Sequence, residues 1–421
     1  MGEWIDAVAA AERLGVKPAT LYAYVSRGVL RRRRDADGRR SLFDAEEIEE
    51  LARRGRPRRP PSPTELEIES AITALGPDRH YYRGRDATEL ATTSTFEEVA
   101  GWLWTGEHDP AARAPGEGRP GEGRPGETWR APSDGLAAAV GAQSGLPADV
   151  LPLDRLQVIT MALAAADPLR FQLDRDGVLA TARALIAGLV DALPTATAGA
   201  GADGSIAGRL WGALSERPPE PGLLRVLGAA LVLLADHELA ASTLAARIAA
   251  SVRADPYAVV AVGLGTVGGP LHGGASFGAE RLFAEIGEPG RAGRVIGELL
   301  RAGQRVPGFG HSVYKSGDRR ATVLFDLVRD VAPDHPRLAV ADAVRAEAAR
   351  RRLPEPNVDL ALATLTSVAG MPPGSGEAIF AVARTAGWLA HAIEEYGRAG
   401  PLRPRAVYTG PPLPAAKGRA R

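Results

Sequence analysis

The amino-acid sequence predicts a mainly α-helical protein of two or three domains. The chain has 421 residues, too many for one small core. Apolar residues recur at helical spacing in Ala- and Leu-rich segments such as 95–106, 222–251 and 376–397. Alternating patterns typical of strands are scarce. These observations favour helices throughout most of the chain.

Composition and charge exclude several classes of protein. The 51 basic and 51 acidic side chains cancel, so the whole chain has no electrostatic bias toward nucleic acid or membrane. There is no cysteine, which excludes disulfides, thiolate nucleophiles and cysteine metal sites and fits a reducing compartment. No apolar run reaches the roughly 18 residues of a membrane span, and the acidic, amphipathic N-terminus is unlike a signal peptide. We therefore expect a cytoplasmic protein that has no membrane partner.

The first 60 residues form a unit of their own. Helical spacing begins at Trp4 and stops at Gly15, and Pro18 suits the start of a second helix that ends near Gly28. Two short segments follow on either side of a hairpin signal at residues 37–38, and Asp44 can cap a last helix. This layout is typical of a winged helix-turn-helix and resembles the MerR and excisionase-like DNA-binding modules.

The charge of this unit favours phosphate contacts. Residues 1–60 hold 14 basic and 10 acidic side chains, with four consecutive arginines at 31–34, and a Pro/Arg linker at 55–63 ends the unit. DNA is therefore a possible partner of residues 1–60. The second helix offers few polar side chains for reading base edges, so the alternative is a module kept for packing or dimerisation.

Three stretches carry no chemistry of their own. The exact repeat "PGEGRPGEGRPGE" at 115–127 and the stretch near residue 200 predict surface loops. The pattern "GLGTVGG" at 263–269 matches a dinucleotide fingerprint. However, Pro270 follows it and no strand–helix–strand pattern surrounds it, so we reject a nucleotide site.

Four segments carry candidate acid–base residues: "LADHELAAST", "GPLHGGAS", "VPGFGHSVYKSGDRRA" and "EPNVDLAL". They contain His237, His272, His311 and Asp359. Three histidines and an aspartate can complete a zinc site, but metal-free proton transfer uses the same residues. Five glycines surround His272, and we interpret them as letting the backbone fold closely around a ligand.

Three arginines extend this set. Arg320 follows His311, Arg384 lies in "VARTAGW" and Arg403 lies in "PLRPRAVYTG". Guanidinium groups clamp carboxylates through paired hydrogen bonds. With the histidines and Asp359, they suit a dicarboxylate substrate that undergoes proton-transfer chemistry.

These motifs together carry a resemblance to a known family. In order they are "YYRGRDATEL", "TFEEVAGWLWTGE", "ADHEL", "GPLHGGA", "PGFGH", "PNVD", "RTAGW" and "RPRAVYTG". From about Thr64 to the end, the chain resembles citrate synthase. The resemblance implies a large helical domain over 64–273 and 371–421, a small domain over 274–370, and a homodimer.

The resemblance also implies roles for individual residues. Asp359 would remove a methyl proton from acetyl-CoA, His272 would stabilise the resulting enol or enolate, and His311 would protonate the oxaloacetate carbonyl. A thioester α-proton is far less acidic than a carboxylic acid, so the base needs this oxygen stabilisation and a site closed to water. Oxaloacetate would be bound by His237, Arg320, Arg384 and Arg403, the last reaching across from the other subunit. CoA would be bound by Val306, Pro307, Gly308, Phe309, Gly310, Lys315, Arg351 and Arg352, with Arg350 beside them. No metal and no cofactor besides the acyl-CoA substrate is implied.

Several positions depart from the common family pattern. Ala240, Ser276, Ser312 and Arg319 replace the usual residues, and "LALATL" follows Asp359. These departures leave the acyl specificity open, because one added methylene is worth roughly 1–3 kcal/mol of discrimination. Citrate synthesis is the first hypothesis. The alternatives are 2-methylcitrate synthesis from propionyl-CoA and a DNA-binding regulator that senses metabolites through a synthase body.

Overall fold

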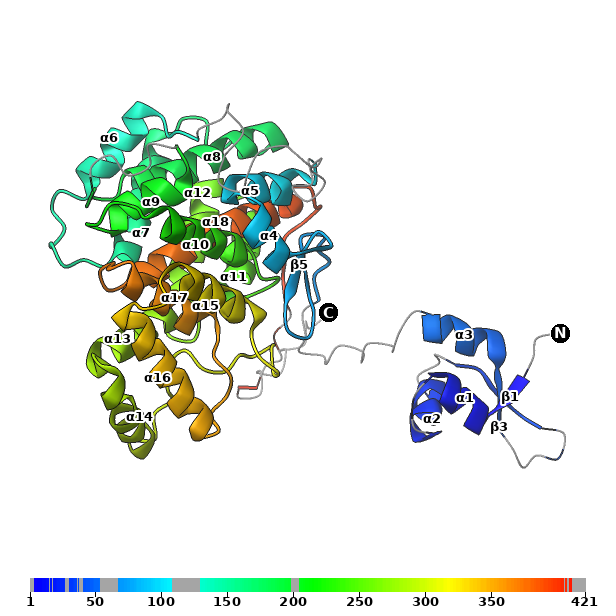
Figure 1. Ribbon diagram of the computed structural model, residues 1–421. Coiled ribbons are helices and arrows are strands. Elements are labelled where there is room, and N and C mark those ends of the chain that lie inside the picture. Colours follow the sequence, from blue (N-terminus) through cyan, green and yellow to red (C-terminus); the bar gives the residue numbers. More distant parts are fainter. Residues whose placement is uncertain are drawn as a thin grey trace. The chain divides into compact units, whose positions relative to one another are not determined.

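A computed structural model describes residues 4–14, 16, 18–26, 30–35, 37, 41–53, 67–107, 129–197, 204–404, 406 and 409–410. The chain divides into two compact units, Met1–Glu69 and Ser70–Arg421 (Figure 1). Four sequence predictions lie wholly or largely outside the described residues: the turn at Gly38, the linker at 55–63, the repeat at 115–127 and the loop near residue 200.

The front unit combines three helices with a three-stranded antiparallel sheet. Its elements are β1 (Trp4–Asp6), α1 (Ala7–Leu14), α2 (Pro18–Ser26), β2 (Arg32–Arg34), β3 (Ser41–Asp44) and α3 (Ala45–Arg53). The strand order is β1-β3-β2, and Ile5 pairs with Phe43. Pro18 begins α2 as predicted, and Asp44 Oδ1 accepts from Glu46 N at 3.0 Å at the start of α3.

One prediction in this unit is wrong. We expected a helix from Trp4, but Trp4–Asp6 is a strand that pairs with β3. Asp6 explains the boundary, because its Oδ1 accepts from Val8 N at 3.0 Å and Ala9 N at 2.9 Å. An N-terminal cap of this kind requires extended backbone at Asp6, which leaves Ile5 free to enter the sheet and the small core.

The body is built mainly of helices, as predicted. They are α4 (Ala87–Thr93), α5 (Phe96–Thr105), α6 (Ser133–Ala142), α7 (Pro152–Ala166), α8 (Arg175–Asp191), α9 (Ile206–Leu214), α10 (Pro221–Leu234), α11 (Ala241–Ser251), α12 (Pro256–Val267), α13 (Ala275–Ile286), the 3-10 turn η2 (Pro289–Arg291), α14 (Ala292–Arg301), α15 (Arg319–Val331), α16 (Pro336–Arg350), α17 (Val358–Val368) and α18 (Ser375–Tyr396). The "GLGTVGG" pattern begins inside α12, so it does not form the strand-to-helix turn of a nucleotide site. No helix in the described ranges has both the length and the apolar character needed to cross a membrane.

A small sheet in the body was not predicted. It consists of β4 (Thr73–Leu75), β5 (His80–Tyr82) and β6 (Arg85–Asp86), antiparallel in that order. Strands of two or three residues are too short to show an alternating pattern in the sequence. The sheet matters for the site because it places His80 and Tyr82 beside the loop that carries His237.

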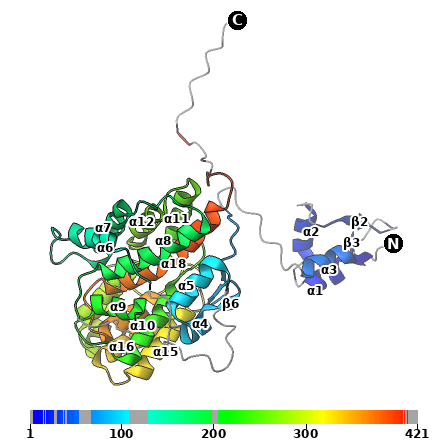
Figure 2. The ribbon, with the colours of Figure 1, turned by 90° about the horizontal axis from the view of Figure 1, so that it is seen from above.

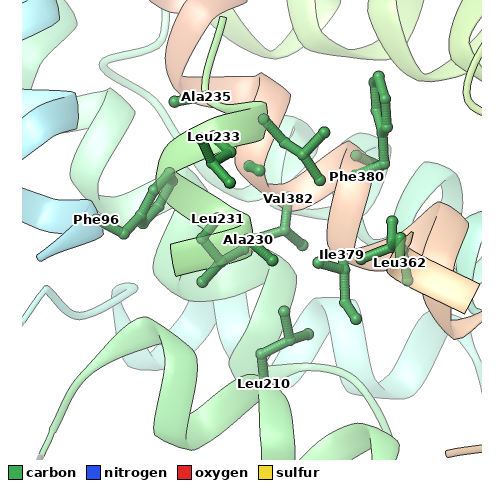
Figure 3. Packing of buried hydrophobic residues seen from close by; sticks show 14 of the residues in the cluster. Phe96, Leu210, Ala230, Leu231, Leu233, Ala235, Leu362, Ile379, Phe380 and Val382 are labelled. Atoms are coloured by element: carbon green, nitrogen blue, oxygen red, sulfur yellow. The ribbon is translucent and has the colours of Figure 1, made fainter. Parts of the chain in front are cut away.

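Helix α18 forms the centre of the body. Its 22 residues are almost all buried, and it packs against α5, α7, α8, α10, α11, α12, α13 and α17. Figure 3 shows Ile379, Phe380 and Val382 of α18 among side chains of α9, α10 and α17. A helix surrounded in this way has a fixed position, so the polar side chains that it carries are held rigidly.

Helices α13, α14 and α16 gather at one end of the body, away from α6 and α8 (Figure 1). The view from above again shows α16 apart from α6 (Figure 2). They lie within the segment 274–370 that we assign to a small domain. The contacts of the chain nevertheless join residues 70–421 in one unit, and the boundaries at 274 and 370 stay a prediction.

Candidate active site

The loop between α10 and α11 carries His237 and is fixed by a buried carboxylate. Asp236 is fully buried, and its Oδ2 accepts from Thr73 Oγ1 at 2.5 Å and from Glu238 N at 3.1 Å. Burial alone would raise the pKa of Asp236, but the neighbouring His391, Arg384 and Thr73 lower it overall. A carboxylate anchored in this way sets the backbone on both sides of His237.

His237 lies at the centre of a group of aromatic rings. Its Nε2 is 2.8 Å from the Tyr314 hydroxyl, and its ring centroid is 5.5 Å from that of His311 and 5.4 Å from that of His80. Burial, followed by the charge of Arg320, lowers the pKa of His237 well below its usual value. The ring is therefore neutral, and its two nitrogens have different roles.

His272 lies in a tight turn between α12 and α13. A Cβ on Gly274 would lie 2.7 Å from the carbonyl oxygen of Gly268. The turn therefore folds back on the end of α12, and the glycine is needed for that contact. At position 274 the turn itself requires glycine, and the interpretation that the glycines also let the backbone fold closely around a ligand stays a prediction.

The side chain of His272 is oriented by Ser242, which lies on α11. Ser242 Oγ accepts from Trp388 Nε1 at 3.1 Å and lies 2.7 Å from His272 Nε2. Because the indole N–H can only donate, the serine hydroxyl is free to donate to His272 Nε2. Burial, followed by the charge of Arg384, lowers the pKa of His272 to about 4. The neutral ring then carries its proton on Nδ1.

The two ring nitrogens of His311 have the opposite roles to those of His272. Its Nδ1 accepts from Val313 N at 3.1 Å and from Tyr314 N at 3.2 Å, so the proton of the neutral ring lies on Nε2. Burial and then Arg320 lower the pKa of His311 to about 4. The Arg320 Nη2 atom is 3.3 Å from His311 Nε2, and a substrate oxygen placed beside both groups would accept from each.

Two buried arginines lie beside these histidines. Arg320 donates from Nε and Nη2 to Asp318 at 2.9 and 2.8 Å, and Asp318 also accepts from Val358 N. Arg384 differs, because only its Nε has a partner, the Leu234 carbonyl at 2.8 Å. Its Nη1 and Nη2 atoms are buried without a hydrogen bond in the described part of the chain. The N–H groups of these two atoms are therefore available to donate hydrogen bonds to a bound anion.

Asp359 lies in the first turn of α17. Asn357 caps this helix, because its Oδ1 accepts from Asp359 N at 3.0 Å and Leu360 N at 3.4 Å. The Oδ1 atom of Asp359 is buried and has no hydrogen bond with the described residues. Burial raises the pKa of Asp359 to about 7, against the opposing charge of Arg320. Such a carboxylate is a stronger base than an exposed aspartate.

The loop that carries His311 is fastened to the loop that carries Asp359. Asn357 Nδ2 donates to Gly310 O at 2.9 Å, and Asn357 N donates to Gly308 O at 2.9 Å. Gly308 has φ +83°, and a Cβ there would lie 2.7 Å from Leu360. The two loops therefore approach more closely than any other residue at position 308 would allow.

Several of the other residues predicted to bind CoA are buried or already make contacts within the protein. Val306 is buried, and Phe309 pairs with Pro356 in an isolated β-bridge. Lys315 Nζ donates to the His311 carbonyl at 3.2 Å. Arg351 pairs with Glu347 and donates from Nη2 to Gly293 O at 2.9 Å, so it supports the fold of this segment. Pro307 is half-buried, and Arg352 is exposed.

The structure does not bring Arg403 together with the other predicted site residues. It is exposed, and no hydrogen bond, ion pair or ring contact links it to the other predicted site residues within the described ranges. The same ranges contain no group of three or more His, Asp or Glu side chains arranged to hold a metal ion. The neighbouring arginines Arg320 and Arg384 also make this a poor environment for a cation.

The sequence did not single out three residues that contact the predicted site histidines. Tyr314 and Ser242 lie inside the quoted motifs, but their contacts with His237 and His272 span 77 and 30 residues of chain. His80 is fully buried, and its ring packs against that of His237. Both of its ring nitrogens lack a hydrogen-bond partner in the described structure, and burial lowers its pKa to about 3. Only the fold brings these residues to the site.

The site combines the carboxylate of Asp359, neutral imidazole donors and the buried guanidinium groups of Arg320 and Arg384. A neutral N–H donor stabilises a developing negative charge on oxygen, and a buried carboxylate of raised pKa accepts a proton from carbon. Buried guanidinium groups bind carboxylates. The site therefore suits proton abstraction and carbonyl chemistry on an anionic substrate.

Comparison with known proteins agrees with this description. Residues 65–405 match the family described as "Citrate synthase, C-terminal domain", and residues 4–56 match "Helix-turn-helix domain". Citrate synthase 2 of Bacillus subtilis is 38% identical over 47% of this chain, a match that spans 54% of that protein, about half its length. The 2-methylcitrate synthase 2 of Corynebacterium glutamicum is 28% identical over 81% of this chain and 92% of that protein.

The fold is shared with solved structures as well. The crystal structure of citrate synthase from Thermotoga maritima is 27% identical and matches with a TM-score of 0.64, covering 83% of this chain and 94% of that one. The family match covers far more than half of the chain, from β4 to beyond α18. The chain therefore belongs to the citrate synthase family, a family of condensing enzymes, and carries a helix-turn-helix domain at its N-terminus.

Proposed function

We propose that this chain condenses acetyl-CoA with oxaloacetate to give citrate and CoA. The observation that carries the proposal is Arg384, a buried guanidinium whose two terminal nitrogens have no partner among the described residues. A buried guanidinium whose terminal N–H groups lack hydrogen-bond acceptors is costly, and a substrate carboxylate would supply those acceptors. The Arg320–Asp318 pair and His237 beside it suit the rest of a small dicarboxylate.

The proposed mechanism begins with proton transfer from carbon. Asp359 removes a proton from the acetyl methyl group while His272 donates from Nδ1 to the thioester oxygen, so that an enol forms without a full charge on oxygen. The raised pKa of Asp359 brings its basicity near neutral pH, where a general base is most effective. Ser242 keeps His272 in the tautomer that this step requires.

Carbon–carbon bond formation follows at the second pair of donors. The enol carbon attacks the ketone carbon of oxaloacetate, and His311 donates from Nε2 to the oxygen that becomes the hydroxyl group. The enol O–H proton returns to Nδ1 of His272 as the thioester carbonyl forms again. Arg320 lies 3.3 Å from the same nitrogen and stabilises the charge that develops there. Water then hydrolyses the thioester, which releases citrate and CoA.

We propose that the active form is a homodimer in which Arg403 completes the site of the other subunit. Arg403 is exposed and apart from the cluster, which is the position expected of a residue that serves a neighbour. Exposed apolar side chains on neighbouring helices offer an interface: Met161 on α7, Ile248 on α11 and Val262 on α12.

A comparison of two acyl-CoA substrates decides which acyl group the enzyme transfers. Initial rates with acetyl-CoA and propionyl-CoA, each with oxaloacetate, are measured together with product masses. A higher kcat/KM for acetyl-CoA supports citrate synthesis. A preference for propionyl-CoA supports 2-methylcitrate synthesis, the activity named for the Corynebacterium glutamicum relative. No condensation with either substrate contradicts both.

A second function is proposed for the front unit, namely binding to DNA. The observation in its favour is strand β2, whose residues Arg32–Arg34 are all exposed. Arg31 is less suitable, because it pairs with Glu47 and Asp44 of its own unit. Full-length protein and the Arg32→Ala, Arg34→Ala variant are titrated against labelled duplex DNA at several salt concentrations. The variant should bind all sequences more weakly, with a smaller salt dependence, and equal binding contradicts this role.

A further inference from the structure

Tyr314 joins two of the predicted site histidines. Its hydroxyl lies 2.8 Å from His237 Nε2, and its ring stacks on that of His311, with centroids 4.7 Å apart and an interplanar angle of 18°. The side chain is buried, with 3% of its surface exposed. Neither the composition of the site nor the family resemblance assigns a role to this residue.

The direction of the hydrogen bond follows from the available partners. Within the described residues, the Tyr314 hydroxyl has one hydrogen-bond partner, His237 Nε2. If the imidazole donated, the buried phenol O–H would be left without an acceptor, which costs about 1–3 kcal/mol. Burial raises the pKa of Tyr314, so the phenol keeps its proton. The hydroxyl therefore donates, and Nε2 accepts.

The tautomer of His237 then follows. The ring is neutral, because burial and the nearby Arg320 lower its pKa. With Nε2 accepting, the single ring proton lies on Nδ1, which has no hydrogen-bond partner among the described residues. His80 packs against the ring at 5.4 Å and supplies no bond that would favour the other tautomer.

We propose that Tyr314 is a positioning residue that fixes His237 as an Nδ1–H donor toward the acceptor substrate. This inference rests on the proposed function, in which His237 contacts oxaloacetate. Ser242 acts on His272 by the same geometry, through a hydroxyl at 2.7 Å from Nε2. Loss of such an orienting bond lets the ring adopt the wrong tautomer or rotate, and both weaken the hydrogen bond to the substrate.

The Tyr314→Phe variant tests this role because it keeps the ring that stacks on His311 and removes only the hydroxyl. We expect kcat/KM for oxaloacetate to fall about tenfold, the effect of one misplaced hydrogen bond, while KM for the acyl-CoA changes less than about twofold. Tyr257→Phe is the matched control, because it removes a buried phenol hydroxyl that is bonded to Asp167 at 2.9 Å and has no hydrogen bond with a predicted site residue in the described structure. It should leave both constants unchanged.

Nitrogen-15 NMR of histidine-labelled enzyme reads the tautomer directly. The His237 signals are assigned by their absence in His237→Gln. The wild type should show a protonated Nδ1 and an unprotonated Nε2, and Tyr314→Phe should show a mixture. A protonated Nε2 in the wild type overturns the proposal, as do unchanged kinetics in Tyr314→Phe. If the wild type condenses neither acyl-CoA, the proposed function fails separately, and the NMR spectrum still decides the role of Tyr314.

Discussion

The histidines His237, His272 and His311 share one arrangement at the residue scale. Each is neutral, and each has one nitrogen that accepts from a donor of the protein: Tyr314, Ser242 or backbone amides. The other nitrogen must then carry the proton and donate. The sequence revealed the histidines through their motifs but not their tautomers, because the donors to His237 and His272 come from distant parts of the chain.

Asp359 should reduce the stability of the folded protein at neutral and higher pH. Its pKa rises from 3.8 to about 7 on folding, so the folded state binds this proton more tightly than the unfolded state does. The free energy of unfolding therefore falls as pH rises from about 4 through about 7. Asp359→Asn should raise Tm at pH 8, by about 1–2 °C for each kcal/mol relieved in a unit of this size, and by less at pH 5.

The measurement is thermal unfolding of both proteins across this pH range. Asp149→Asn serves as the control, since Asp149 is exposed and its replacement should not change Tm. A difference in Tm that does not vary with pH would show that the carboxylate of Asp359 is not the group responsible.

At the scale of elements, the beginning of α17 places the proposed base. Asn357 caps this helix and also holds the Gly308–Gly310 loop through two hydrogen bonds. Asn357→Ala should cost about 1 kcal/mol of stability and should also lower kcat at least tenfold, because the variant loses the cap of α17 and the side-chain bond to Gly310 O and keeps only the backbone bond to Gly308 O.

Asp174→Ala is the matched control, since Asp174 caps α8 through Gly177 N at 3.0 Å and contacts none of the predicted site residues. It should show a similar loss in Tm by thermal unfolding but full activity in the steady-state assay. Equal activity in the two variants would show that the Asn357 cap contributes to stability alone.

The sequence predicted long elements better than short ones. Periodic helices such as α10 and α18 were recognised because many apolar positions repeat at one spacing. The strand Trp4–Asp6 and the β4–β6 sheet were missed, because two or three residues cannot display a period. Their positions depend on partners elsewhere in the chain, such as Phe43 for Ile5.

At the scale of the whole molecule, the site is assembled from loops far apart in the sequence. His237 and His311 lie in two different loops, Asp359 lies in the first turn of α17, and α18 adds Arg384 from the centre of the core. The resemblance supplied this set in advance. What it did not supply is the physical state of each group, such as the unpartnered nitrogens of Arg384 or the paired state of Arg351.

A shared active site predicts complementation between two inactive variants. Arg403→Ala and Asp359→Asn subunits are mixed under conditions that allow exchange. In a mixed dimer, one of the two sites regains both residues, so an equal mixture should recover roughly a quarter of wild-type activity. Absence of recovery, with exchange verified by mass spectrometry of differently labelled subunits, would contradict a contribution of Arg403 across the dimer.

Release of the CoA thiol reports the proposed condensation directly. The chain has no cysteine, so a thiol-reactive dye reports free CoA without any background from the enzyme. Wild-type protein should release thiol only when acyl-CoA and oxaloacetate are both present, whereas Asp359→Asn should release none and still bind oxaloacetate by calorimetry. Wild-type protein that releases no thiol would contradict the proposed condensation, and Asp359→Asn that releases it at the wild-type rate would contradict the role of Asp359 as the base.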